Sequence, residues 1–259
     1  MSVNYEKILA KLDRPPSGPN WARFVHPDVN KTAKSILHFV KGVPPVTYRT
    51  GYTVIRDRIQ FGIDLETAIN SIRRSSAPKS RLPNEEFVKA FFEHDERRRY
   101  HGHRSIEFDK ESFRISRDIV VPVAPLSVIH ENGSFVPLFI CGWSSLNLSL
   151  FQRRLLVTIT EDAFLSLTDF QHSPAEFLFF PKPSSKLKQS RVSEIWHRGD
   201  YELLSNNEIN EAVDNFLEAR ALARQVILDE KENAPRNQTE SGADRSEDFG
   251  DLFGGLELP

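Results

Sequence analysis

The densest group of chemically capable side chains in this sequence runs from residue 97 to residue 104. Within these eight residues it holds Arg97, Arg98, Arg99, Tyr100, His101, His103 and Arg104. Arginine guanidinium groups bind phosphate oxygens in a bidentate way, and a tyrosine ring can stack on a nucleobase. The segment therefore predicts a local contact with DNA or RNA. The alternative is a helix end whose cations interact with the helix dipole and with the neighbouring acids Glu93, Asp95 and Glu96.

A second polar group, Gln152, Arg153 and Arg154, lies in a segment whose apolar residues predict a helix from residue 146 to residue 158. Leu148, Phe151, Leu155 and Val157 supply that apolar pattern. The three polar side chains are also predicted to contact phosphate.

Two other combinations of residues have the types needed for chemistry. His101 and His103 are two residues apart, so on a strand both would project to the same side and could begin a metal site. Their spacing supplies no third ligand. Cys141 and His130 lie in one predicted hairpin, yet a cysteine between Ile140 and Gly142 is typical of a core residue. We therefore predict no metal site, no cofactor and no catalytic residue.

The central element of the sequence is a predicted hairpin. An apolar run from residue 119 to residue 129 is followed by Asn132-Gly133 and a second apolar run from residue 135 to residue 141. Asn-Gly is a strong hairpin signal because both residues tolerate positive φ. A helix and then a strand from residue 176 to residue 180 are expected to follow.

This order of strand, turn, strand, helix and strand resembles the core of the PD-(D/E)XK nuclease superfamily. The resemblance covers residues 84 to 228 at most and implies a restriction-endonuclease-like fold. In that superfamily Pro-Asp opens the first strand and Glu-x-Lys closes the second. Here the first position reads Pro125-Leu126, and the second falls within residues 139 to 143, which contain no carboxylate and no lysine. Such a core cannot hold Mg²⁺ in the usual way, because Mg²⁺ needs oxygen ligands.

A displaced active site is the alternative to an inactive one. The acids in a position to contribute are Glu85 or Glu86, Asp118 and Glu131, with Lys182 or Arg153 in place of the superfamily lysine. Such a site would make the protein a metal-dependent nuclease.

The last part of the sequence predicts a disordered acidic tail from residue 231 to residue 259. Apolar residues are absent from residue 235 to residue 248 apart from Ala243, and then Phe249, Leu252, Phe253 and Leu256 recur among acids. Apolar anchors between carboxylates are typical of a docking peptide, since the anchors fill a pocket and the acids approach a basic rim. These four residues are predicted to bind a protein partner.

The remaining pattern predicts an α+β fold with a mixed central sheet flanked by helices. We expect an N-terminal helical arm over residues 1 to 19, a main domain over residues 20 to 230, and the tail. A helix is expected from Asn84 to Arg98 with Asn84 as its cap, and another after the capping box Ser205-Asn206-Asn207-Glu208. Residues 48 to 61 could be strand or loop.

Composition limits the location and the partners. The net charge is −2, so no overall field draws the chain to nucleic acid or to an anionic membrane, and any such contact must be local. The single cysteine excludes an intramolecular disulfide, and no apolar run has the length of a membrane span. The sequence predicts a cytoplasmic protein without membrane contact.

Three functions follow from these observations. The first is a catalytically inactive, nuclease-like protein of a nucleic-acid-handling complex, which binds nucleic acid locally and a protein partner through its tail. The second is the nuclease with a displaced site. The third is a protein-interaction module unrelated to nucleic acid.

Overall fold

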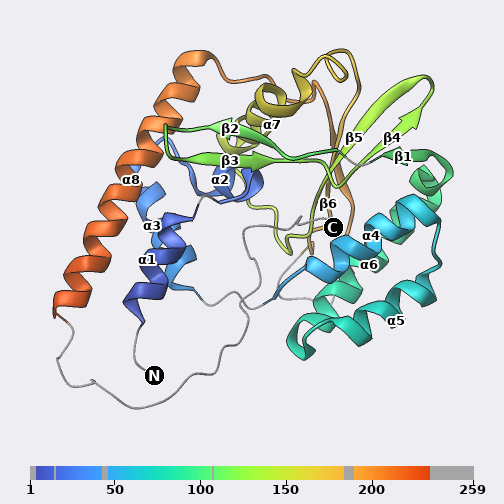
Figure 1. Cartoon of the computed structure of the whole chain (residues 1–259), viewed down its shortest axis with the longest axis horizontal. Helices are drawn as coiled ribbons and strands as arrows, with labels where there is room; N and C mark the ends of the chain where they lie inside the picture. Colours follow the sequence, from blue (N-terminus) through green and yellow to red (C-terminus); the bar gives the residue numbers. More distant parts are fainter. Residues whose placement is uncertain (1–3, 15, 43–45, 107, 184–189, 234–259) are drawn as a thin grey trace.

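The computed structural model describes residues 4–14, 16–42, 46–106, 108–183 and 190–233. Within them the protein is α+β, with eight α-helices, a five-stranded mixed sheet and a separate two-stranded hairpin (Figure 1). The α+β prediction is confirmed. The helices are α1 (Tyr5–Asp13), α2 (Gly18–Phe24), α3 (Val29–Lys41), α4 (Arg49–Phe61), α5 (Leu65–Ser75), α6 (Pro78–Arg98), α7 (Leu150–Thr160) and α8 (Asn206–Asn233). No helix in the described ranges is long and apolar enough to cross a membrane.

The five-stranded sheet has the strand order β1-β4-β5-β6-β7. Strands β5 and β6 are parallel and are joined by a connection that contains α7, whereas the other neighbouring pairs are antiparallel. The separate hairpin pairs β2 with β3. The strands are β1 (Arg104–Ile106), β2 (Glu111–Arg114), β3 (Val120–Val123), β4 (Ser127–Glu131), β5 (Ser134–Cys141), β6 (Glu176–Phe179) and β7 (Glu194–His197).

The predicted turn at Asn132-Gly133 is confirmed. It joins β4 to β5, with φ of 50° at Asn132 and 80° at Gly133. The sequence led us to expect that the apolar run before this turn forms one strand, but it forms two. It divides at Pro125 into β3, which pairs with β2, and β4, which belongs to the larger sheet. Proline has no N–H for a sheet hydrogen bond and restricts the residue before it, so a change of sheet is favoured at this point.

Helices cover both faces of the larger sheet (Figure 1). The side chains of successive strand residues alternate between two cores, as the period of a strand requires. In β6, Phe177 and Phe179 pack in the core with α1, α2, α3, α7 and α8, while Leu178 packs in the core with α4, α5 and α6. The expectation of a mixed sheet flanked by helices is therefore confirmed as well.

Several helical boundaries differ from the prediction. The helix expected from residue 146 to residue 158 is α7, which begins at Leu150 and ends at Thr160. Residues 49–61, left undecided between strand and loop, form α4. Helix α6 begins at Pro78, not at Asn84, and continues through Pro83. Asn84 is therefore no cap: it lies inside α6, where its Nδ2 donates to the Thr47 and Ser80 carbonyls and its Oδ1 accepts from the Gly51 N–H. Pro83 is the sixth residue of α6, so it leaves the carbonyl four residues earlier without the usual helical N–H donor.

The two terminal helices lie side by side. Helix α1, the predicted N-terminal arm, packs against α3 and α8 (Figure 1). The capping box before α8 is present, since the Ser205 N–H donates to the Glu208 carboxylate and the Glu208 N–H donates to Ser205 Oγ. Helix α8 extends to Asn233, so residues 231–233, which were assigned to the disordered tail, are helical.

Candidate nucleic-acid interface

The predicted basic segment lies where α6 ends and the larger sheet begins. Arg97 and Arg98 complete α6, and Arg99 ends it with a left-handed backbone at φ 62°. A short 3₁₀ turn, Tyr100–Gly102, then leads into β1 at Arg104. This path places neighbouring residues of the segment on different sides of the chain, so the cluster divides into an inward and an outward set.

Arg98 belongs to the inward set and joins α6 to two strands. Its guanidinium donates in bidentate geometry to the Glu131 carboxylate at the end of β4, at 2.7 and 2.5 Å, and its Nη2 donates to Glu176 Oε1 in β6 at 2.8 Å. Hydrogen bonds from Arg98 hold the pKa of Glu131 below its usual range, and hydrogen bonds to Glu131 and Glu176 raise the pKa of Arg98. Because both carboxylates already accept from Arg98, its charge is compensated within the fold.

Tyr100 is fully buried, with 0% of its surface exposed. Its hydroxyl donates to Glu176 Oε2, its ring stacks on Phe91, and the Arg98 guanidinium lies 5.0 Å from the ring centroid. Burial, followed by the nearby Glu176 charge, raises the pKa of the phenol. The ring that the sequence assigns to base stacking thus lies in the core.

Asp95 centres a second inward network. Its side chain is 0% exposed and accepts from Arg58 Nε at 2.6 Å, and His101 Nδ1 lies 2.6 Å from the same Oδ2 atom. The Arg58 Nη2 group also donates to Glu96. His103 faces the other network instead, with Nε2 3.2 Å from Glu131 Oε1. The two histidines therefore contact different carboxylates, and the described residues contain no group of three or more possible metal ligands.

Arg97, Arg99 and Arg104 form the outward set. All three are exposed, and none forms an ion pair with another described residue. Arg99 occupies the left-handed position that follows a helix. This position is usually taken by glycine, because a Cβ atom is disfavoured there. Its N–H closes the helix on the Asp95 carbonyl. These three cations are free to meet an anionic ligand.

The second predicted segment is used within the fold. Gln152 is only 3% exposed; its Nε2 donates to the Arg23 and Val25 carbonyls and its Oε1 accepts from the Ser149 N–H. Arg153 Nη1 donates to Glu194 and to the Tyr201 hydroxyl, and the guanidinium lies 5.2 Å from the Trp196 ring centroid. These contacts place both side chains between α7 and its neighbours.

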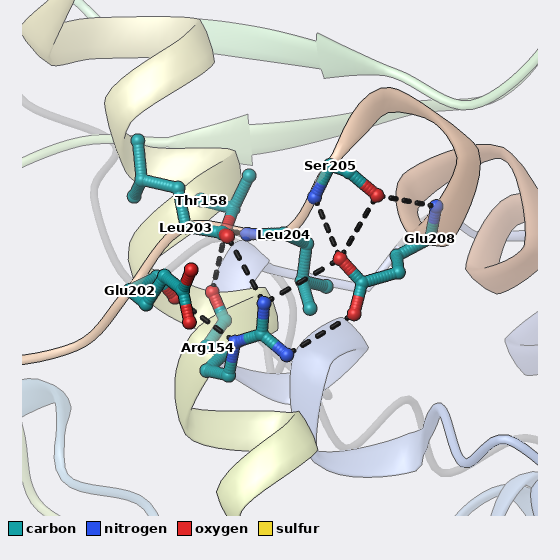
Figure 2. Close-up of polar contacts among 7 residues, drawn as sticks. All are labelled: Arg154, Thr158, Glu202, Leu203, Leu204, Ser205 and Glu208. Atoms are coloured by element: carbon teal, nitrogen blue, oxygen red, sulfur yellow. Dashed lines mark hydrogen bonds and ion pairs between the residues drawn. The ribbon is translucent and has the colours of Figure 1, made fainter.

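Arg154 has the largest number of internal acceptors of this segment. Figure 2 shows its guanidinium between the Glu202 and Leu203 carbonyls and the Glu208 carboxylate, which also closes the capping box with Ser205. One turn further along α7, Thr158 Oγ1 accepts from the Leu204 N–H. Arg154 therefore fixes the chain that enters α8.

The candidates for a displaced active site lie in separate places. Lys182 Nζ pairs with Glu86 at 2.7 Å, whereas Glu85 pairs with Arg73. Glu131 belongs to the Arg98 network, and Asp118 lies exposed in the turn between β2 and β3. The described chain brings Glu86 and Lys182 together, but it does not join them to the other two acids.

Cys141 and His130 lie apart in the same hairpin. His130 is paired in register with Phe135, and Cys141 is six residues further along β5. At about 3.3 Å per residue they are separated by roughly 20 Å. Cys141 is buried, and its burial raises the pKa of the thiol to about 12. The reading of Cys141 as a core residue agrees with this position.

Two partners in these networks were not anticipated from the sequence. Arg58 lies in the segment that was left undecided, and Glu176 opens an apolar strand where no role was assigned to it. A lone acid at the start of the run Glu176 to Phe180 was the available signal, since a buried carboxylate requires a cation or donors.

The predicted partner-binding residues Phe249, Leu252, Phe253 and Leu256 lie outside the described residues. Comparison with known proteins adds no further constraint: no family model matches the chain, and no similar protein is found among curated proteins or solved structures.

Proposed function

We propose that this protein is a catalytically inactive, nuclease-like protein that binds the backbone of nucleic acid through Arg97, Arg99 and Arg104. The carrying observation is the division of the basic segment. Arg98, Tyr100, His101 and His103 contact the carboxylates of the fold, while the three outward arginines have no ion-pair partner among the described residues.

The inward set supports the outward one. Arg98 anchors the end of α6 to Glu131 in β4 and to Glu176 in β6, and His101 contacts Asp95. These three contacts hold the backbone from Arg97 to Arg104 in place. A fixed backbone lowers the entropy lost when the exposed arginines are ordered on a ligand. Arginine is suited to this ligand because its planar donors match two phosphate oxygens.

The backbone of Arg99 adds a second argument. Glycine is the favoured residue at a left-handed helix end, and a side chain there costs on the order of 1 kcal/mol. Here the position carries an exposed arginine with φ 62°. Residues held in costly conformations often serve function. A phosphate ligand would account for the cation at this position.

Further parts of the proposal rest on the sequence. The restriction-endonuclease-like arrangement is supported by the order β4, β5, α7, β6 with β5 and β6 parallel. Absence of catalysis is supported by Leu126 and by residues 139–143 at the positions where the superfamily has its acids. The acidic tail would recruit a protein partner within a nucleic-acid-handling complex.

A single gel experiment tests the proposal. The purified full chain is incubated with labelled single-stranded and double-stranded DNA and RNA in Mn²⁺, and retardation and cleavage are read from the same gel. We expect the protein to retard the oligonucleotides, less so as the salt concentration rises, and not to cleave them. Any trace of cleavage should persist with a chelator and in the Asp118→Ala variant. Cleavage that the chelator and Asp118→Ala both abolish would establish the displaced-site nuclease. If the gel shows no retardation and no cleavage, the remaining function is the protein-interaction module.

The variant Arg99→Gly separates binding from folding. It removes one cation and relieves the left-handed backbone, so the fold is retained while affinity for the retarded oligonucleotide falls and its dependence on salt decreases by about one phosphate contact. Arg74→Gln, which removes an exposed cation from α5, is the matched control and should leave the affinity unchanged.

A further inference from the structure

A row of three side chains crosses the first three strands of the larger sheet and begins at one of the outward arginines. Arg104 in β1 lies directly opposite His130 in β4, and His130 lies directly opposite Phe135 in β5. Directly opposite residues of antiparallel strands project from the same face of a sheet, with Cβ atoms about 5 Å apart. The row therefore places a free guanidinium beside two aromatic rings.

The two rings differ in exposure. His130 is exposed, and its imidazole forms no hydrogen bond and no ion pair with another described residue, whereas Phe135 is half-buried. The two ring centroids lie 5.6 Å apart in an edge-to-face contact. Phe135 also meets the ring of Phe170, which is 0% exposed, at 6.1 Å between centroids. The core thus holds the phenylalanine ring in place, and the phenylalanine ring supports the exposed imidazole.

The row lies near the turn of the β4–β5 hairpin (Figure 1). Successive strand residues project to opposite faces, so Glu131, the neighbour of His130, is on the other face, where it accepts from Arg98. This ion pair fixes the end of the hairpin to the end of α6. The rings therefore have a fixed position relative to the basic segment.

An exposed ring beside a cation favours one class of nucleic acid. Phosphates are accessible in single strands and duplexes alike, but the flat face of a base is open only where the strand is unpaired or unstacked. Histidine and phenylalanine are among the side chains on which such bases stack. The sequence assigned this role to Tyr100, whose ring is buried, and the row supplies rings that an unpaired base can reach.

We propose that the ligand of the outward arginines is single-stranded nucleic acid, with a phosphate at Arg104 and the adjoining base stacked on His130, which Phe135 supports. This inference rests on the proposed function and names the class of ligand at that site.

The test measures fluorescence anisotropy with the full-length protein and three labelled ligands, made as DNA or RNA according to which the gel retards more. They are a short single strand, the duplex that it forms with its complement, and an abasic strand of the same length, which keeps the phosphates and lacks the bases. The wild-type protein should bind the base-bearing strand about fivefold more tightly than the abasic strand, as expected for one stacked base.

Variants of His130 locate the stacking. His130→Ala should weaken binding of the base-bearing strand by about fivefold and leave the abasic strand, the duplex and the salt dependence unchanged, because stacking involves no counterion release. His130→Tyr keeps a ring at this position and should retain the wild-type affinity. His197→Ala, which removes an exposed histidine from β7 at the opposite edge of the same sheet, is the matched control and should have no effect.

Three results would overturn the inference while the affinity remains dependent on salt and on the outward arginines. They are equal affinities for the base-bearing and abasic strands, equal losses in the strand and the duplex on His130→Ala, and equal losses for His130→Tyr and His130→Ala. No salt-dependent binding of any of the three ligands would contradict the proposed function together with this inference.

Discussion

The segments 97–104 and 152–154 are both basic, yet their side chains serve the fold to different extents. In the segment on α7 all three polar side chains have internal acceptors: carbonyls for Gln152, a carboxylate and a hydroxyl for Arg153, and both carbonyls and a carboxylate for Arg154. In the segment at the end of α6, Arg98 is engaged with Glu131 and Glu176 while Arg97 and Arg99 on either side of it are exposed.

The acceptors that the fold places beside a basic cluster therefore decide which of its side chains can bind a ligand. Helix α7 lies against the chain that enters α8, so Arg154 and Thr158 meet the backbone of Leu203 and Leu204 (Figure 2). The end of α6 lies at the edge of a layer, where one side of the chain faces the sheet and the other faces solvent. Substitutions in the two segments test that distinction.

Replacing Arg98 should have the largest effect on stability. Arg98→Met leaves Glu176, whose side chain is 7% exposed, without its cation, and we expect a loss of about 3 kcal/mol in the free energy of unfolding. Urea denaturation measures it. Arg97→Met, one residue away and exposed, is the control and should change stability by less than about 0.5 kcal/mol. Equal losses for the two variants would remove the distinction between inward and outward arginines.

Replacing Gln152 tests the second segment. Gln152→Leu keeps the size of the side chain but takes the donor away from the Arg23 and Val25 carbonyls, so we expect a loss of about 2 kcal/mol in the free energy of unfolding. Affinity for the oligonucleotide should not change. Leu150→Gln, at an exposed site in the same helical turn, is the control for stability. A drop in oligonucleotide affinity at unchanged stability would contradict this account and would indicate that the 152–154 segment contacts nucleic acid.

Two variants of Arg99 sharpen the account of the outward set. Arg99→Gly should be more stable than Arg99→Ala by about 1 kcal/mol, since only glycine adopts the left-handed backbone without a Cβ conflict. Both remove the same cation and should lose the same affinity for the oligonucleotide. Thermal denaturation and anisotropy measure the two quantities. Unequal affinities would mean that the backbone conformation, and not the charge, determines binding.

The smallest effect concerns the acid side of the stability profile. The folded-state pKa of Glu131 is lowered by Arg98, so its contribution is fully present above the unfolded value of about 4.3 and is lost as the pH falls through the lower folded value. Glu131→Gln should therefore make stability less dependent on pH below about pH 4.5. Urea midpoints at several pH values measure it, and a profile parallel to that of the wild-type protein would contradict the assignment.

Much of the fold could be predicted because local signals determine it. Asn132-Gly133 closes the hairpin, and Ser205 with Glu208 begins α8, each through contacts within a few residues. Asn84 misled the prediction for the opposite reason. Its side chain bonds Thr47 and Gly51, which are far away in the sequence, so a residue typical of caps is stable inside a helix.

The candidate site could be predicted only as a region. The basic composition of residues 97–104 is visible in the sequence, but the division between Arg98 and Arg99 depends on Glu131 and Glu176, which are 33 and 78 residues from Arg98. The helical period separates Arg97 from Arg98, but the left-handed end at Arg99 interrupts that period, so it does not give the directions of the residues from Arg99 to Arg104. The direction of each side chain became visible only with the fold.

The most direct test compares two triple variants of the full chain in oligonucleotide binding across a series of salt concentrations. One replaces Arg97, Arg99 and Arg104 with glutamine, and the other replaces the exposed arginines Arg49, Arg74 and Arg117, with the same change in net charge. We predict that the first lowers the steepness of the logarithmic salt dependence by about three and the second leaves it unchanged. Equal changes in both, or a wild-type protein without salt-dependent affinity, would contradict the account.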